Sequence, residues 1–437
     1  MNGAREAALR ALTAFRRSRT WPQDALDDAI RRVGLDGRDA ALSQKICRGV
    51  LRNMAFLDWH LARIASRPCG KIEPRILDIL RISAYQILFL DRVPVRSAVD
   101  EGVELAKRSG QAAAGFVNAV LRRLAAERDA LPEIKCDTLP QTLSTRWSHP
   151  EWLVEELLSR LGETECVRLL KADAEEPELT LQRNPLKADT KTVLQALTPF
   201  KARPHAWQPD AYVISGVGKL TELEPVRDGL VWVQDAAARA AVSAAGPRPG
   251  MFVLDVCAAP GGKSFAAASE MMNRGAILAC DLAEKKLFRI REGAGRLGIT
   301  ILRTEARDAT LEWKDTSGKA DLVIADVPCS GFGTLRKNPD VRYKQREDVM
   351  HLPEVQSRIL EKASEAVKPG GVLLYSTCTV RSDENENIVE DFLRMHEEFH
   401  LEPYSVPGVD APRGFLTFWP HVHGTDGFFA AKLRRND

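Results

Sequence analysis

The stretch Asp321–Gly333, DLVIADVPCSGFG, contains the features that decide the fold. Its apolar run Leu322–Ala325 is typical of a buried strand in a parallel sheet. The strand ends at Asp326, and Pro328–Cys329 follows directly, so a carboxylate and a thiol come where the strand stops. In open α/β sheets this end of the strands binds ligands, although Asp-x-Pro turns and packing cysteines are common as well. A second thiol, Cys378 in LLYSTCT, follows another predicted strand, and the two together indicate covalent chemistry.

The composition indicates a globular protein of two or three domains. The chain has 437 residues, of which 44% are hydrophobic and 28% charged. No apolar run approaches the roughly 20 residues of a membrane span, and the N-terminus lacks a signal core, so we expect a cytoplasmic protein with no membrane contact. The formal net charge is +2, so nucleic-acid binding requires local basic patches. The eight cysteines form no CxxC pair and no zinc spacing, so we expect reduced thiols and no metal.

The pattern along the chain predicts three parts. Residues 1–128 are helical throughout, with a helix RILDILRISAYQILFL that is apolar almost all round and therefore buried at the centre. Residues 129–146 are rich in proline and polar residues and are predicted to be a linker. Residues 147–235 begin with an amphipathic helix and continue as a small α+β subdomain.

Residues 236–437 are predicted to form a Rossmann-like α/β domain. The strand signals FVLDVC, AILACD, ITILRT, LVIAD and GVLLYST recur with helical segments between them, as in a doubly wound parallel sheet. The last stretch, FLTFWPHVHGTDGFFAAKLRR, predicts an antiparallel pair of strands at the edge of that sheet.

A glycine-rich loop, Val256–Ser264 (VCAAPGGKS), lies between the first of these strands and a helix. Its spacing differs from GxGxxG and from the P-loop. Small residues at a helix N-terminus allow a bulky ligand to approach the backbone. Asp281 follows the next strand, where a carboxylate can accept both ribose hydroxyls, and Asp308 follows the third strand, where it suits an adenine amino group. These features predict a ligand that contains adenosine.

The string DVCAAPGGKS resembles motif I of the NOP2/Sun family of S-adenosylmethionine-dependent RNA 5-methylcytosine methyltransferases. GVLRNMAFLDWHL, ILRISAYQILFLDRVPVRSAVDEGVELAK and GFVNAVLRRL resemble the NusB-type RNA-binding domain, which precedes the catalytic domain in the RsmB/Sun proteins, bacterial ribosomal RNA cytosine methyltransferases. The resemblance implies that Asp281 binds the ribose of S-adenosylmethionine, Asp308 its adenine, and that Asp326 reaches the cofactor side. Asp308 follows Ala306–Arg307, where the family usually has a GDA-like string. The residues implied to line the methionine part are Cys257, Ala258, Ala259, Pro260, Gly261, Gly262 and Lys263.

The same resemblance assigns the reactive residues. Carbon 5 of cytosine is a poor nucleophile until a thiolate adds to carbon 6. NOP2/Sun proteins use the cysteine of a Thr-Cys pair for this step, which implies that Cys378 is the nucleophile and Cys329 assists product release. Asp326 would hold the target base, and donation to the ring nitrogen would require its protonated form.

Basic residues predict the RNA contacts. A basic segment after Cys329 suits a single-stranded RNA backbone beside an extruded base, with a solvated loop as the alternative. The residues concerned are Arg336, Lys337, Arg342 and Lys344. In the helical part, phosphate contacts or solvated helix faces are expected at Arg16, Arg17, Arg19, Arg48, Arg52, Arg122 and Arg123.

These observations predict a monomeric enzyme that uses S-adenosylmethionine to make 5-methylcytosine in small-subunit (16S) ribosomal RNA, unassembled or partly assembled. The same chemistry on tRNA is one alternative. A NusB-like RNA-binding assembly factor with a vestigial catalytic half is another, although the intact cysteines argue against decay. A DNA methyltransferase would leave Cys378 without a role.

Overall fold

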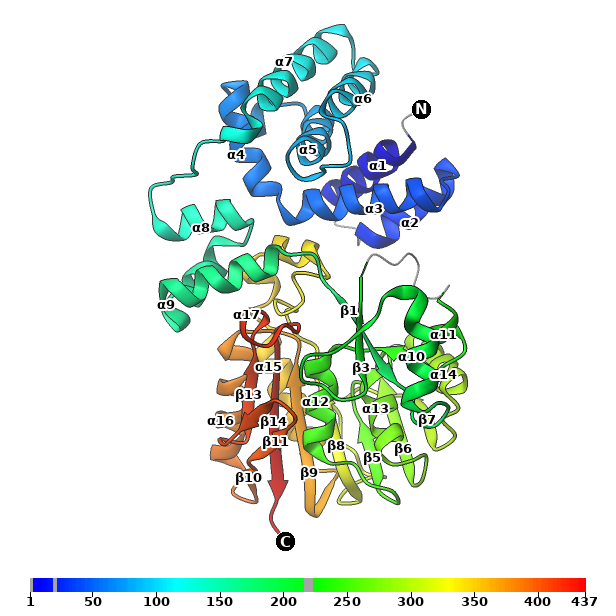
Figure 1. Cartoon of the computed structure of the whole chain (residues 1–437). Helices are drawn as coiled ribbons and strands as arrows, with labels where there is room; N and C mark the ends of the chain where they lie inside the picture. Colours follow the sequence, from blue (N-terminus) through cyan, green and yellow to red (C-terminus); the bar gives the residue numbers. More distant parts are fainter. Residues whose placement is uncertain (1–2, 19–21, 216–222) are drawn as a thin grey trace. The chain divides into compact units, whose positions relative to one another are not determined.

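The computed structural model describes residues 3–18, 22–215 and 223–437. By its internal contacts the chain forms two compact units, whose elements are labelled in Figure 1. The first unit comprises Met1–Glu175 together with Leu335–Gln345. The second comprises Glu176–Thr334 and Arg346–Asp437. A short segment of the C-terminal half therefore belongs to the N-terminal unit.

The first unit is helical, as predicted. The helix α5 (Pro74–Phe89) lies at its centre, and its buried side chains extend round the whole helix, including the carboxylate of Asp78. Arg16 and Arg81 pair with that carboxylate at 3.2 and 3.1 Å, which compensates its burial. The other elements are α1 (Gly3–Ser18), α2 (Pro22–Val33), α3 (Gly37–Arg52), α4 (Met54–Ala65), η1 (Cys69–Lys71), α6 (Val95–Lys107), α7 (Gln111–Glu127), η2 (Arg128–Ala130), α8 (Leu139–Trp147) and α9 (Glu151–Ala174).

The predicted linker 129–146 contains a helix. The hydroxyl of Thr138 accepts a hydrogen bond from the backbone N–H of Gln141 and caps α8, and Pro140 occupies the first turn, where its missing N–H costs nothing. The proline that suggested a loop therefore marks a helix start. The amphipathic helix α9 also belongs by its contacts to the helical unit, so this unit extends beyond the predicted boundary at residue 128.

The segment Leu335–Gln345 is anchored in the helical unit. Arg342 is 3% exposed, and its guanidinium donates to the carbonyl oxygens of Leu335 and Asp173, each at 2.7 Å. Tyr343 donates from its hydroxyl to the carbonyl oxygen of Leu51, and its ring packs edge-on against Phe15. The prediction that Arg342 contacts RNA is therefore wrong for this structure, because its donors are used in the protein interior.

The second unit contains two sheets. The smaller is antiparallel, in the order β2-β3-β1-β4, and forms the predicted α+β subdomain. One face of this sheet packs against α10 and α11, and the other face is largely buried as well, with Trp232 in the core that contains α12–α14. Its strands therefore alternate only in part between buried and exposed residues. Its elements are β1 (Leu179–Arg183), α10 (Thr190–Leu197), η3 (Thr198–Phe200), β2 (Arg203–Pro204), β3 (Ala211–Ile214), α11 (Glu224–Arg227) and β4 (Val231–Val233).

The larger sheet is mostly parallel and has the order β10-β14-β9-β8-β5-β6-β7. Successive residues of its strands enter two different cores: Leu322 and Ile324 pack with α12–α14, whereas Val323 and Ala325 pack with α15 and α16. Helices therefore cover both faces, as Figure 1 shows. The elements are α12 (Ala236–Ala245), β5 (Phe252–Asp255), α13 (Gly262–Glu270), β6 (Ala276–Asp281), α14 (Glu284–Leu297), β7 (Leu302–Ala306), β8 (Ala320–Asp326), η5 (Pro339–Tyr343, in the helical unit), η6 (Arg346–Asp348), α15 (Leu352–Ser364), β9 (Val367–Thr377), η7 (Ser382–Glu384) and α16 (Glu386–Met395).

The C-terminal strands are antiparallel, but they do not both lie at the edge. The strand β14 (Phe428–Arg435) pairs with β9 on one side and with β10 (Phe399–Leu401) on the other, and β13 (Phe415–Phe418) pairs with β14 as well. The prediction of a simple edge pair missed β10, whose three residues give too short an apolar pattern. The remaining elements are β11 (Tyr404–Val406), β12 (Val409–Ala411) and α17 (Pro420–His423).

The strand order reverses between the neighbouring strands β5 and β8. On the β5 side the sheet continues with β6 and β7, and on the β8 side it continues with β9. Ligands of doubly wound folds bind at the carboxyl ends of the strands at such a point. The glycine-rich loop follows β5 and Asp326 ends β8, so both predicted features lie at this position.

Candidate active site

The glycine-rich loop forms one wall of a cavity of about 200 Å³. Gly261 caps α13 with a φ of 110°, and a Cβ there would also lie 2.4 Å from the Phe265 ring, so only glycine fits. The helix then starts with its free backbone N–H groups at the loop. The cavity is lined by Val233, Gln234, Ala238, Asp255, Cys257, Ala258, Ala259, Pro260, Gly262, Lys263 and Asp326.

Asp281 and Asp308 follow neighbouring strands outside that cavity lining. Asp281 ends β6, is 8% exposed, accepts from the backbone N–H of Ala283 at 3.1 Å and lies 3.4 Å from Lys286. Asp308 follows β7, and its Oδ1 accepts from the hydroxyl and the backbone N–H of Thr310, which lower the pKa of that carboxyl. Because β6 and β7 are parallel neighbours, both carboxylates lie at one edge of the sheet, as the sequence predicts.

The two thiols of Cys329 and Cys378 lie together, with their sulfur atoms 3.1 Å apart. The hydrogen bond with Cys378 and burial raise the pKa of the Cys329 thiol well above its usual value, and the charges of Glu384 and Asp326 add to this. Either thiol can donate the hydrogen bond between the two sulfur atoms. The loops that carry them are also joined by the backbone, since Gly333 N–H donates to the Cys378 carbonyl oxygen at 2.9 Å.

Asp326 lies in a polar cluster at the end of β8. Its Oδ2 is 2.5 Å from Nζ of Lys263, and its Oδ1 accepts from the hydroxyl of Ser376 at 2.8 Å. The ammonium of Lys263 also lies 4.9 Å from the centre of the Phe428 ring, a cation–π distance. Lys263 thus joins the glycine-rich loop to Asp326, a link that spacing alone did not predict.

A buried carboxylate that the sequence interpretation missed, Glu384, joins the two cysteine loops. It is fully buried, and its Oε2 accepts from the backbone N–H of Ser330 at 2.8 Å and from Nε2 of Gln356 at 2.9 Å. Its Oε1 is 3.3 Å from the Arg381 guanidinium. Ser330 directly follows Cys329, and Arg381 lies three residues after Cys378, so Glu384 holds both loops. Its only signal in the sequence is a charged run, SDENEN, which is usually a solvated surface.

Asp255, at the end of β5, is the second group that the sequence interpretation missed. It is fully buried, and burial raises the pKa of its carboxyl to about 7, against the effect of a 2.6 Å hydrogen bond from Ser264. Its Oδ1 has no hydrogen-bond partner of good geometry among the residues that the structure describes. A buried acceptor without a partner at a cavity wall is expected to meet a ligand donor.

Comparisons with known proteins find matches along nearly the whole chain. A family model described as "16S rRNA methyltransferase RsmB/F" matches residues 242–434, and a NusB family model matches residues 2–126. A "Methyltr_RsmF/B-like, ferredoxin-like domain" model matches residues 149–220. The "Probable ribosomal RNA small subunit methyltransferase B" of Bacillus subtilis (strain 168) is 33% identical over 99% of this chain and 98% of its own length. The chain belongs to the RsmB/F family of 16S rRNA methyltransferases.

Other proteins align with this RsmB/F family member over nearly the full length of both chains. The protein of the same description in Synechocystis sp. is 33% identical over the full length of both chains. The crystal structure titled PH0851 has a TM-score of 0.82 at 26% identity and covers 100% of this chain and 99% of that one. The predictions of an rRNA methyltransferase, of a NusB-like front domain and of the fold class are thus confirmed.

Within this RsmB/F chain, the predicted basic RNA contacts have different surroundings. Arg342 is buried and is no longer a candidate for RNA contact. Arg336, Lys337 and Lys344 are partly exposed, and their contact with RNA remains a prediction. Among the front-domain arginines, Arg52 is 6% exposed and donates to the Arg336 carbonyl oxygen, so it is a packing residue. Arg19 lies outside the described residues. Exposed positions in this set are Arg16, Arg17, Arg48, Arg122 and Arg123.

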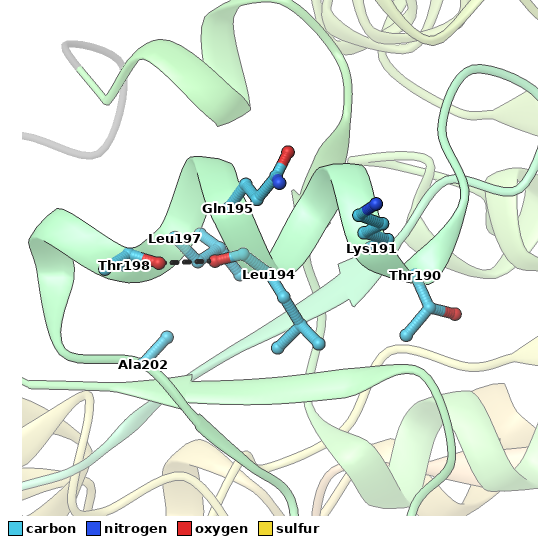
Figure 2. A pocket seen from close by; sticks show the side chains of 7 residues that line it. All are labelled: Thr190, Lys191, Leu194, Gln195, Leu197, Thr198 and Ala202. Carbon is cyan, nitrogen blue, oxygen red and sulfur yellow. Dashed lines mark hydrogen bonds between the residues drawn. The ribbon is translucent and has the colours of Figure 1, made fainter.

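A second hollow of about 610 Å³ lies along α10 of the small subdomain, as Figure 2 shows. Among the described residues that line it, Lys191 is the only charged one and none carries a thiol or a carboxylate, so these residues offer none of the groups that methyl transfer needs. The lining residues are Thr190, Lys191, Leu194, Gln195, Leu197, Thr198 and Ala202.

The described part of the chain lacks two classes of feature. No helix there combines the length and apolar character required to cross a membrane. No group of three or more His, Cys, Asp or Glu side chains is arranged there to hold a metal ion.

The buried carboxyl of Asp255 predicts a pH effect on stability. Its pKa of about 7 in the folded protein lies above the value of 3.8 that applies when it is exposed. As pH rises from about 4 to 7, the unfolded chain loses this proton first, so the free energy of unfolding falls. In the Asp255→Asn variant the free energy of unfolding should not fall in this way between about pH 4 and pH 7. Urea denaturation at pH 5 and pH 7.5 measures it, with Asp100→Asn on the surface as the control. Parallel pH dependences of wild type and Asp255→Asn would contradict the prediction.

Proposed function

We propose that this chain forms 5-methylcytosine in small-subunit ribosomal RNA, with S-adenosylmethionine as methyl donor and a covalent bond between Cys378 and the cytosine as intermediate. The observation that carries the proposal is the pair of thiols 3.1 Å apart beside Asp326, at the edge of the sheet where the glycine-rich loop lies. Two thiols and an acidic group are what a cytosine C5 methylation with separate addition and release steps requires.

The residues of the cavity fit S-adenosylmethionine. The loop Cys257–Lys263 leaves space at a helix N-terminus, and the buried Asp255 Oδ1 is an acceptor available to an ammonium donor. Asp281 is assigned to the ribose hydroxyls and Asp308 to the adenine amino group, both at the adjacent strand ends. S-adenosylmethionine, when bound, supplies an electrophilic methyl group.

The residues of the chain perform the remaining steps. The Cys378 thiolate forms a bond to carbon 6, which moves an electron pair toward carbon 5 so that carbon 5 can accept the methyl group. The C5 proton then passes to solvent, and the electron pair of its C–H bond re-forms the C5–C6 double bond. The bond between carbon 6 and sulfur breaks, and its electron pair returns to Cys378 as the thiolate. Cys329 is assigned to this release, because its thiol is hydrogen-bonded to the Cys378 sulfur.

Asp326 and Lys263 are assigned to the target base. The Asp326 carboxylate already accepts from two donors, so it suits the exocyclic amine of cytosine, which is a donor. Donation to the ring nitrogen can come from the adjacent Lys263 ammonium, which does not require a protonated Asp326. Arg336, Lys337 and Lys344 are proposed to contact the RNA backbone, and the protein is proposed to act as a cytoplasmic monomer on rRNA that is not fully assembled.

The substrate is tested by methylation of purified RNAs. The protein is incubated with labelled S-adenosylmethionine and either naked 16S rRNA, assembled small subunits or bulk tRNA, and 5-methylcytosine is mapped by bisulfite sequencing. We expect one modified cytosine in naked 16S rRNA and little transfer to the other two substrates. Preferred methylation of tRNA would support the tRNA alternative, and RNA binding without transfer to any substrate would support the assembly factor.

A further inference from the structure

Gln234 is a buried side chain at the cavity that the proposed mechanism does not use. It directly follows β4, and its backbone is held on both sides: its N–H donates to the carbonyl oxygen of Thr180 at 3.2 Å, and its carbonyl accepts from Nε2 of Gln182 at 3.1 Å. The residue is 7% exposed and lines the cavity. Its position is therefore fixed by the small sheet, whereas its side chain faces the glycine-rich loop.

The orientation of the Gln234 amide is determined by a neighbouring indole. Nε1 of Trp232 lies 3.1 Å from the amide oxygen. An indole N–H can only donate, so the atom that it contacts must be Oε1, and the amide nitrogen must be on the other side. That nitrogen has no hydrogen-bond partner among the described residues. A buried donor left without an acceptor destabilises the folded protein, and this cost is recovered if a ligand supplies the acceptor.

The unpartnered amide nitrogen is directed at the start of α13. It is the atom nearest to the point where a Cβ on Gly262 would lie, at 3.6 Å. Gly262 is the first residue of this nine-residue helix, whose free N–H groups and dipole favour an anion. Asp255, whose Oδ1 is an acceptor without a hydrogen-bond partner of good geometry among the described residues, lines the same cavity. One cavity thus offers a donor set for an anion and an acceptor for a cation.

We propose that Gln234 binds the α-carboxylate of the methionine part of S-adenosylmethionine through its amide N–H. This rests on the proposed function, which supplies the cofactor. An α-amino acid group carries a carboxylate and an ammonium on one carbon, and so complements Gln234 with the helix start on one side and Asp255 on the other. Trp232 is a positioning residue, because its indole N–H keeps the amide nitrogen of Gln234 directed toward the carboxylate.

The proposal is tested by ligand binding without RNA, using isothermal titration calorimetry of the full-length protein. The probes are S-adenosylhomocysteine, its decarboxylated analogue, and 5′-methylthioadenosine, which lacks the whole amino acid part. Gln234→Leu should weaken binding of S-adenosylhomocysteine by about 10- to 100-fold, the range for a hydrogen bond to a charged group. Binding of the decarboxylated analogue and of methylthioadenosine should change less than about twofold. Gln234→Glu should weaken the binding of S-adenosylhomocysteine further, because the new carboxylate would repel the carboxylate of the ligand. Trp232→Phe should give a smaller loss with the same selectivity.

Three outcomes would overturn the assignment. Equal weakening of all three probes would mean that Gln234 only supports the cavity wall. Unchanged binding of every probe, with a raised KM for RNA, would assign Gln234 to the target base. Equal weakening of S-adenosylhomocysteine and of its decarboxylated analogue, with methylthioadenosine unchanged, would place the amide at the ammonium group instead of the carboxylate. If the wild type binds none of the probes, the proposed function itself fails, which is a distinct result.

Discussion

Cys378→Ala is expected to abolish methyl transfer and to form no covalent complex with RNA, whereas Cys329→Ala is expected to accumulate one. In the proposed mechanism the sulfur of Cys378 forms the bond to carbon 6, so without it carbon 5 stays unreactive. Cys329 is proposed to act after methyl transfer, so its loss should stop the reaction at the protein–RNA adduct. The thiols are 3.1 Å apart, which puts both within reach of one base and makes sequence position a poor guide to their roles.

The measurement is a denaturing gel of protein incubated with labelled RNA and S-adenosylmethionine, followed by mass spectrometry of the cross-linked peptide. Cys136→Ala, a cysteine of the helical unit, is the matched control and should keep wild-type activity without an accumulated adduct. An adduct in Cys378→Ala and none in Cys329→Ala would reverse the two assignments.

Glu384→Ala is expected to lower the free energy of unfolding by about 3–5 kcal/mol, the cost of breaking a buried ion pair. Glu384 is fully buried, and its carboxylate accepts from the Ser330 backbone, from Gln356 and from Arg381. Without it, Ser330 N–H loses this acceptor in the interior, and the loops of Cys329 and Cys378 lose the side chain that joins them. Activity should therefore fall further than the loss of folded protein explains.

Urea denaturation gives the stability, and single-turnover methylation of the remaining folded protein gives the activity. Glu384→Gln keeps the shape and the acceptor oxygen, so it should be less destabilised than Glu384→Ala and should recover part of the methylation rate. Glu390→Ala, an exposed glutamate of α16, should change stability by less than about 0.5 kcal/mol. If Glu384→Ala were as stable as Glu390→Ala, the charged run would be a surface feature after all.

Local sequence was a sufficient guide wherever a feature depends on neighbours along the chain. The strands that end at Asp255, Asp281 and Asp326 were predicted because a buried parallel strand is a continuous apolar run with a polar residue after it. Local sequence predicts structure less well where the same residue type occurs in two different structural settings. Pro140 suggested a loop but lies in the first turn of α8, and Arg342 suggested a surface contact but bonds carbonyl groups in the interior.

The sequence by itself determined the fold class, the glycine-rich loop, the carboxylates at the strand ends and the positions of the two cysteines, because these are local patterns or motif resemblances. Only the tertiary structure decided which side chains meet. Residues about fifty positions apart place two sulfur atoms at 3.1 Å, and Glu384 joins their loops. The Trp232 indole selects one orientation of the Gln234 amide, which faces a loop from a different sheet. Burial and hydrogen-bond geometry depend on how distant segments pack, and no spacing in the chain records that.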